Sequence, residues 1–145
     1  EFDHVMTNPP YMAAGSGRVS PDEGKATAHA ESHVGLSEWL SICIRATRSR
    51  GTVTIVHRAD RLEDILSTMA GKLGHIVVFP LWSADDENRP EPLTPASRVV
   101  VSGRKGVNTP GQLKRGIRLH ENDSGTYTPE AISILSGGMS LNLFD

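Results

Sequence analysis

Apolar and polar residues recur along the chain with two different periods, and their order predicts an α/β fold. Short runs of β-branched and apolar residues, which are typical of buried strands, occupy residues 2–7, 52–57, 75–82 and 97–102. Apolar residues at helical spacing occupy residues 35–49 and 60–73, and a shorter helical segment occupies residues 129–136. Residues 12–34 are rich in Gly, Ala and Ser, which indicates a loop.

Local signals mark the ends of two predicted helices. Asp60 followed by Glu63 resembles a capping box for the second helix, and Gly74 is a suitable residue for its C-terminal cap. Thr128 before Pro129 is the expected N-terminal cap of the last helix, which a pair of glycines then terminates.

The order of the elements also predicts the strand directions. The first three strands alternate with helices, and such units form parallel strands with right-handed crossovers. Residues 83–96, a loop rich in prolines and acids, join the last two strands, so we expect these strands to form an antiparallel hairpin.

The composition is that of an ordinary globular domain. The chain has 145 residues, of which 37% are hydrophobic and 22% are charged, and these values argue against global disorder. No apolar run approaches the roughly 20 residues of a membrane span, and no signal peptide is visible, so we expect a cytoplasmic protein without membrane contact. The single cysteine, Cys43, lies in an apolar helical pattern and is expected to be a buried thiol.

The chain opens inside a predicted strand. It has no initiator methionine, and Glu1 leads directly into residues 2–7. Because a natural domain rarely begins in the middle of a buried strand, we expect the chain to be part of a longer protein.

Charge is segregated in the second half of the chain. The net charge is −2, which by itself indicates no polyanionic partner. Residues 98–118 contain no acidic residue, however, and the acids gather just upstream in residues 85–91. This segment predicts either a surface for an anion such as an RNA backbone or a solvated basic face. Its basic residues are Arg98, Arg104, Lys105, Lys114, Arg115 and Arg118.

The strongest chemical signal is Asn8-Pro9-Pro10-Tyr11, which directly follows the first predicted strand. Ligands of open α/β sheets bind at the carboxyl ends of strands. An exocyclic amino nitrogen is a poor nucleophile because its lone pair is delocalised. The Asn8 side-chain oxygen and the Pro9 carbonyl can accept both of its N–H groups, which favours a pyramidal nitrogen with an available lone pair. Two prolines fix the backbone, and Tyr11 offers an aromatic face to a flipped-out base.

Several of these residues also have a purely structural interpretation. The NPPY segment has the alternative interpretation of a proline-rich turn, and Trp39 and Trp82 are expected to be core or half-buried residues, with base stacking as the alternative. His29 and His33 have a metal-like spacing without an evident third ligand, so no metal site is expected.

Residues 2–11 (FDHVMTNPPY) resemble motif IV of the class I, Rossmann-like methyltransferases that modify exocyclic or amide nitrogens. Further segments are similar to the bacterial tRNA(adenine-N6)-methyltransferases, namely residues 20–21, 28–31, 97–106, 119–120, 125–128 and 134–135. The resemblance spans most of the chain, but only the NPPY motif is specific. It implies S-adenosylmethionine as the cofactor.

The resemblance also implies a strand order of 3-2-1-4-5-7-6, of which this chain supplies the fourth to seventh strands and their helices. Within this family the glycine-rich turn and the acidic residue that bind the cofactor precede residue 1, and residues 15–17 and 103–106 lack the context to replace them. Residues 1–145 are therefore expected to be the C-terminal, catalytic part of one methyltransferase domain. Asn8 is the residue expected to reach the cofactor. The edge of the first strand is expected to pair with the N-terminal half or with another copy.

These features favour a methyltransferase of an exocyclic amino nitrogen, with adenine N6 of tRNA as the expected target. We expect this chain alone to be inactive. Protein glutamine N5-methyltransferases of release factors carry the same motif and are the close alternative. A non-catalytic RNA-binding or assembly module and a small-molecule methyltransferase are further alternatives.

Overall fold

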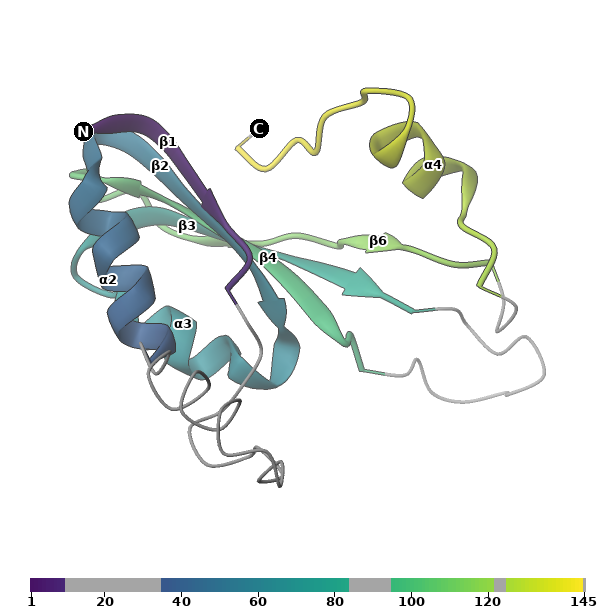
Figure 1. Cartoon of the computed structure of the whole chain (residues 1–145), viewed down its shortest axis with the longest axis horizontal. Coiled ribbons are helices and arrows are strands. Elements are labelled where there is room, and N and C mark those ends of the chain that lie inside the picture. The colour runs from purple at the N-terminus through teal and green to yellow at the C-terminus, as the bar shows by residue number, and fades with distance from the viewer. Residues whose placement is uncertain (10–34, 84–94, 122–124, 145) are drawn as a thin grey trace, which may run out of the picture.

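The computed structural model describes residues 1–9, 35–83, 95–121 and 125–144, which form strands and helices in alternation (Figure 1). The strands are β1 (Phe2–Thr7), β2 (Thr47–Arg58), β3 (Leu73–Trp82), β4 (Arg98–Lys105), β5 (Gln112–Leu113) and β6 (Ile117–Arg118). The helices are α2 (Leu36–Ala46), α3 (Leu62–Met69) and α4 (Pro129–Leu135), and a 3-10 turn over Ala59–Arg61 precedes α3. None of these described helices has the length and apolarity that crossing a membrane requires.

The strands form one mixed sheet in the order β1-β2-β4-β3, with β5 and β6 along the outer edge of β3. β1 and β2 are parallel, whereas β4 lies between β2 and β3 and is antiparallel to both. The α/β class and the antiparallel hairpin of β3 and β4 are therefore confirmed. The order also equals the 4-5-7-6 portion of the sheet that the resemblance implies.

The main core lies between the sheet and the two helices α2 and α3, which cover the same face (Figure 1). Side chains alternate between the two faces of a strand, so Val53 and Ile55 of β2 point toward these helices together with Val99 and Val101 of β4. Each fully buried Val, Leu or Ile side chain stabilises the fold by about 1.5–3 kcal/mol. The helices complete this cluster with Leu40, Ile44, Ile65 and Met69.

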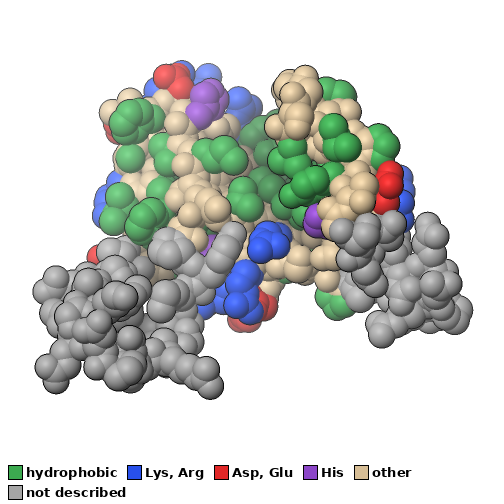
Figure 2. Space-filling model, turned by 45° about the vertical axis from the view of Figure 1, so that its right-hand side comes forward, with side chains coloured by type: hydrophobic (Ala, Val, Ile, Leu, Met, Phe, Trp, Pro, Cys, Tyr) green, Lys and Arg blue, Asp and Glu red, His purple; other side chains and the backbone are tan. Residues whose placement is uncertain are grey.

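The opposite face of the sheet is covered over β3 and β4 but not over β1. A second cluster joins Phe79, Val100 and Ile117 to side chains of α4 and the C-terminal residues that follow it. Over β1 and β2, polar contacts take the place of a core, such as the 2.6 Å hydrogen bond between His4 and Thr52. Met6 of β1 is 73% exposed. Figure 2 shows hydrophobic side chains in the hollow in the middle of the molecular surface.

The first predicted helix is shorter than residues 35–49, because its last turn belongs to β2. The backbone turns extended at Thr47, whose hydroxyl donates a hydrogen bond of 2.8 Å to the Cys43 carbonyl. Thr47 then pairs with Phe2 of β1. Pairing within the sheet therefore overrides the helical periodicity of residues 47–49. Gly51 suits this pairing, since a Cβ there would lie 2.6 Å from the Asp3 carbonyl oxygen.

Both predicted caps of the second helix were wrong. Asp60 lies in the 3-10 turn and forms an ion pair with Arg58, and α3 begins at Leu62 without a side-chain cap. The helix ends at Met69, so Gly74 lies in β3, where it is tightly packed against the Val107 carbonyl. Gly71, with a φ of 73°, makes the turn instead.

The last helix begins as its local signals predict. The Thr128 side chain accepts a hydrogen bond of 3.2 Å from the Ala131 backbone N–H, and Pro129 occupies the first turn. β5 and β6 were not predicted, because two-residue strands carry no periodic signal. They place the chain that leads to α4 along β3.

The central strand β2 contributes two fully buried side chains, Val53 and Ile55, to the main core, so shortening one of them should lower stability. We expect Ile55→Ala to lower the free energy of unfolding by about 2–5 kcal/mol, because it removes a fully buried side chain. Denaturant titration checks this value, with Leu113→Ala, at a position 77% exposed, as the control expected to change stability by less than about 0.5 kcal/mol. Equal losses in both variants would contradict the assigned core.

Candidate active site

The carboxyl ends of β1 and β2 meet at one edge of the sheet, and this edge holds the described half of the NPPY motif. Thr7 pairs with Ile55, so the residues after β1 lie beside the last residues of β2. Asn8 is exposed at this edge, and Pro9 is buried. Pro10 and Tyr11 lie outside the described residues. An exposed amide directly after a strand end is in a position to accept hydrogen bonds from a ligand at this edge.

The indole of Trp39 in α2 fixes the end of β1. Its Nε1–H donates a hydrogen bond of 2.7 Å to the hydroxyl oxygen of Thr7, the residue immediately before Asn8. Cys43 lies one helical turn further along α2, and burial raises the pKa of its thiol. A thiol with a raised pKa is protonated at neutral pH and is a weak nucleophile. α2 therefore positions the strand end and supplies no covalent chemistry.

Two arginines face each other where β2 ends and β4 begins. Arg58 and Arg98 are Cα partners in the antiparallel pair, and both are exposed. The Arg58 guanidinium forms an ion pair with Asp60 and donates a hydrogen bond of 3.1 Å to it from Nε. Together with Ser97 these residues line a small pocket at the sheet edge. Figure 2 shows Lys and Arg side chains at the lower edge of the surface, between the two grey segments.

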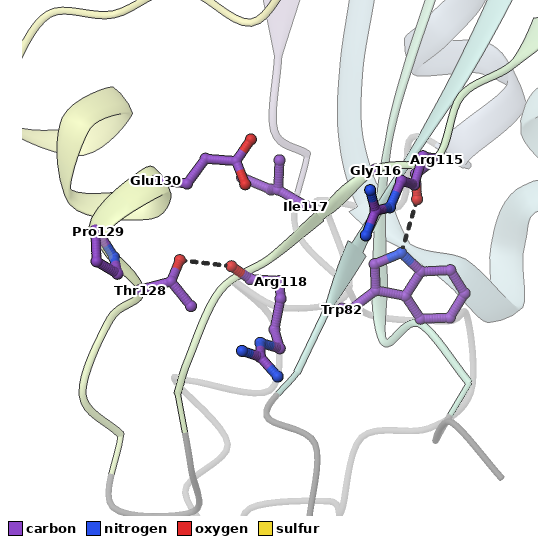
Figure 3. Close-up of a pocket in the computed structure, with 8 residues that line it drawn as sticks. All are labelled: Trp82, Arg115, Gly116, Ile117, Arg118, Thr128, Pro129 and Glu130. Atoms are coloured by element: carbon purple, nitrogen blue, oxygen red, sulfur yellow. Dashed lines mark hydrogen bonds between the residues drawn. The ribbon is translucent and has the colours of Figure 1, made fainter.

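A larger pocket, with a volume of about 780 Å³, opens where β3 ends (Figure 3). The Trp82 indole donates a hydrogen bond of 3.0 Å from Nε1 to the Arg115 carbonyl oxygen, which fixes the ring on one side of the pocket. The Thr128 hydroxyl donates a hydrogen bond of 2.7 Å to the Arg118 carbonyl oxygen on the other side. The described lining consists of Trp82, Arg115, Gly116, Ile117, Arg118, Thr128, Pro129 and Glu130.

The structure separates the six basic residues predicted to bind RNA between the two ends of the sheet, with Lys114 between them. Arg98 and Arg118 lie at the same sheet edge as Asn8, and Arg115 lines the pocket beside Arg118. Arg104 and Lys105 lie at the other end of β4, about 20 Å away at roughly 3.3 Å per residue.

The two residues at the far end of β4 have structural contacts. Lys105 donates hydrogen bonds to the Arg45 and Thr47 carbonyls at the end of α2, and the Arg104 guanidinium lies 5.6 Å from the centroid of the Phe144 ring. Lys114 follows β5, partway along β3, and its backbone N–H donates to the Val78 carbonyl. The basic stretch therefore does not form a single surface.

His57, the last buried residue of β2, lies at the same edge and was not singled out from the sequence. Its side chain is 3% exposed, and burial lowers the pKa of its imidazole below the ordinary value of 6.5. A neutral imidazole adds no charge beside the strand end that carries Asn8. The signal that marks this residue is a histidine at a core-facing position just before the end of a central strand.

The described residues were expected to lack a metal site and a glycine-rich cofactor turn. Groups of His, Cys, Asp or Glu that could hold a metal are absent from the described ranges, and His29 and His33 lie outside them. Gly103 lies within β4 and packs against Leu73, so it cannot form a cofactor-binding turn. At this edge, the described residues after β1, β2 and β3 contain no glycine-rich turn.

Comparisons with known proteins identify the fold. No family model and no curated protein matches the chain. Among solved structures, the crystal structure of a predicted O-methyltransferase, protein Atu636 from Agrobacterium tumefaciens, matches with a TM-score of 0.68 and 19% sequence identity. This chain shares its fold. The match covers 97% of this chain and 53% of that one, so the chain spans about half the length of its structural neighbour.

The lowered pKa of His57 predicts how stability depends on pH near this edge. Because the pKa is lower in the folded state, the unfolded chain binds the proton more tightly, and the contribution of His57 to stability falls as pH drops below about 6.5. Titration of the imidazole followed by NMR should give a midpoint below 6.5. A midpoint at or above that value would show that the ring is not desolvated, and His57→Gln, which removes this signal, assigns the resonance.

Proposed function

We propose that this chain is the catalytic, C-terminal part of an S-adenosylmethionine-dependent methyltransferase that modifies an exocyclic amino nitrogen, with adenine N6 of tRNA as the target. The observation that carries the proposal is the position of Asn8 and Pro9. They follow β1 directly, at the carboxyl edge of a sheet with methyltransferase-like strand order. Cytoplasmic action fits a tRNA substrate.

The chemistry of the edge favours nitrogen as the methyl acceptor. An amino group has two N–H bonds, and the Asn8 side-chain oxygen and the Pro9 carbonyl supply two acceptors next to each other. Holding both hydrogens turns the nitrogen lone pair toward the methyl donor. The structural neighbour is named a predicted O-methyltransferase, but a hydroxyl has a single hydrogen and would leave one of these acceptors unused.

In the proposed reaction, S-adenosylmethionine supplies an electrophilic methyl group on a sulfonium sulfur. A nitrogen–carbon bond forms as the sulfur–carbon bond breaks, and the methylated nitrogen then releases one proton to water. Asn8 and Pro9 orient the nitrogen, so their contribution is positioning and electrostatic stabilisation. No described residue is required as a covalent nucleophile.

The cofactor pocket is proposed to come from a segment that precedes Glu1. Among the described strands, β1 pairs with β2 alone, and Phe2 and Met6 of β1 are 64% and 73% exposed. Apolar side chains on a strand of this kind fit a sheet that continues past β1 and an additional layer over its open face. The match covers 53% of the structural neighbour, and such a continuation would correspond to part of the remainder.

Charge at the same edge supports RNA as the substrate class. Arg98 and Arg118 lie at the ends of β4 and β6 beyond Asn8, and this arrangement fits the phosphates of an RNA. The NPPY motif also fits a protein glutamine substrate, but such a substrate has no phosphates for these arginines to bind.

Methyl transfer to RNA and to protein can be compared directly. The complete protein should transfer a labelled methyl group from S-adenosylmethionine to unfractionated tRNA lacking its modification, and nucleoside analysis should identify N6-methyladenosine. A release factor assayed in parallel should remain unlabelled. Labelling of the release factor alone would overturn the RNA assignment and favour the glutamine alternative.

Asn8 should be essential to the transfer step. We expect Asn8→Ala to lower kcat by about 10²–10³-fold, the effect typical of removing one positioned electrostatic contact. Single-turnover methylation measures this change. Asn108→Ala, at an exposed position near the opposite sheet edge, is the matched control and should retain full activity. A loss below about threefold in Asn8→Ala would remove Asn8 from the reaction.

A further inference from the structure

The pocket at the end of β3 lies at the same sheet edge as Asn8 but several strands away. Thr7 ends β1 beside β2, Arg58 of β2 pairs with Arg98 of β4, and Arg98 pairs with Leu81 of β3. Trp82 then pairs with Arg118 of β6. Four strand spacings of roughly 4.8 Å separate β1 from β6, which makes about 19 Å. The pocket is therefore too distant to hold the target nitrogen and close enough to hold a neighbouring part of the same substrate.

The side chains of this pocket combine an aromatic surface with two cations. Trp82 is half-buried, and its only polar group is used in the hydrogen bond to the Arg115 carbonyl, so the ring is held in one orientation. Arg115 and Arg118 are exposed, and Figure 3 shows Arg118 extending toward the same side of the pocket as the Trp82 ring. An indole ring with guanidinium groups beside it suits a base with its phosphates.

Local backbone geometry builds this arrangement. Gly116, which lies between the two cationic residues Arg115 and Arg118, has a φ of 78°, and a Cβ at this position would collide with the Pro80 carbonyl. Only glycine lets the chain pass this close to β3. That close approach brings the Arg115 carbonyl to the Trp82 indole.

The remaining polar group in the pocket also fits a nucleotide. Glu130 projects from the start of α4, and Figure 3 shows its carboxylate on the Ile117 side, away from the Trp82 ring. A carboxylate repels phosphate and accepts hydrogen bonds from base amino groups. The pocket thus has one side suited to phosphate and another suited to a base edge.

We infer that this pocket binds a nucleotide of the RNA substrate that flanks the target adenine, with its base on Trp82 and its phosphates on Arg115 and Arg118. The inference rests on the proposed function, because it takes the substrate of the edge to be RNA. Bound in this way, the flanking nucleotide helps to orient the strand whose target base lies at Asn8.

Charge-removing variants test the phosphate contacts in the complete protein. The double variant Arg115→Gln/Arg118→Gln should bind unfractionated tRNA about tenfold more weakly, and the slope of log affinity against log salt should fall by about 1–2. Arg50→Gln/Lys72→Gln is the matched control, because it removes the same charge from exposed positions toward the opposite sheet edge. It should leave affinity and slope unchanged. Fluorescence anisotropy measures both quantities.

Trp82 fluorescence tests the stacking contact while the Trp82 side chain stays in place. The difference in emission between the unaltered protein and its Trp82→Phe variant isolates the signal of Trp82. Adding tRNA should quench its emission, and Trp82→Ala should weaken binding by about fivefold to a hundredfold, the range for loss of one base–aromatic stack. Circular dichroism confirms that each variant is folded.

The outcomes separate this inference from the proposed function. Unchanged tRNA affinity in the double arginine variant, together with unquenched Trp82 emission, would overturn the inference even if tRNA is methylated. Weakened tRNA binding in that variant, with no methyl transfer to tRNA by the unaltered protein, would retain the RNA subsite and reject the proposed reaction. If the double variant loses affinity for a release factor and keeps its affinity for tRNA, the pocket serves a protein and the inference fails.

Discussion

The parallel pairing of β1 with β2 is the interaction on which the rest of the structure depends. Its register joins Val5 to Val53 and Thr7 to Ile55, so it places β1 beside the core strand β2 and determines the point where the chain leaves the sheet. A slip of one residue would turn the half-buried side of β1, with Val5 and Thr7, to the opposite face and displace Asn8 from the edge. The hydrogen bond from Trp39 to Thr7 supports the same register from the helical layer.

Local chemistry was sufficient to predict much of the fold. The β-branched runs predicted the four main strands, and Thr128 with Pro129 predicted the start of α4, because these signals act within a few neighbouring residues. Element ends depended on more distant partners. Thr47 fits the helical periodicity of the residues before it, but it pairs with Phe2 in the sheet. Gly74 comes directly after a helical pattern, but it packs against the chain after β4 instead of capping the helix.

The candidate site was predictable only in part, for a geometric reason. Asn8 and Pro9 could be placed because they directly follow a strand whose direction the sequence predicts. Arg98 and Arg104 are close in sequence, yet an extended strand carries them to opposite sheet edges, so a basic cluster in the sequence did not predict a cluster in space. Trp82 and Arg118 are far apart in sequence, and the unpredicted strand β6 brings them together. The resulting edge combines the exposed amide of Asn8 with arginines at the ends of β4 and β6.

The central claim is that Asn8 and Pro9 hold a target amino group against a methyl donor. A crystal structure of the complete protein with S-adenosylhomocysteine and an adenine-containing RNA fragment tests it most directly. The account predicts that the adenine N6 nitrogen lies about 2.7–3.2 Å from both the Asn8 side-chain oxygen and the Pro9 carbonyl oxygen. It also predicts that the cofactor sulfur lies on the side of the nitrogen that carries its lone pair. An adenine bound away from Asn8, or a cofactor bound away from the carboxyl end of β1, would contradict the account.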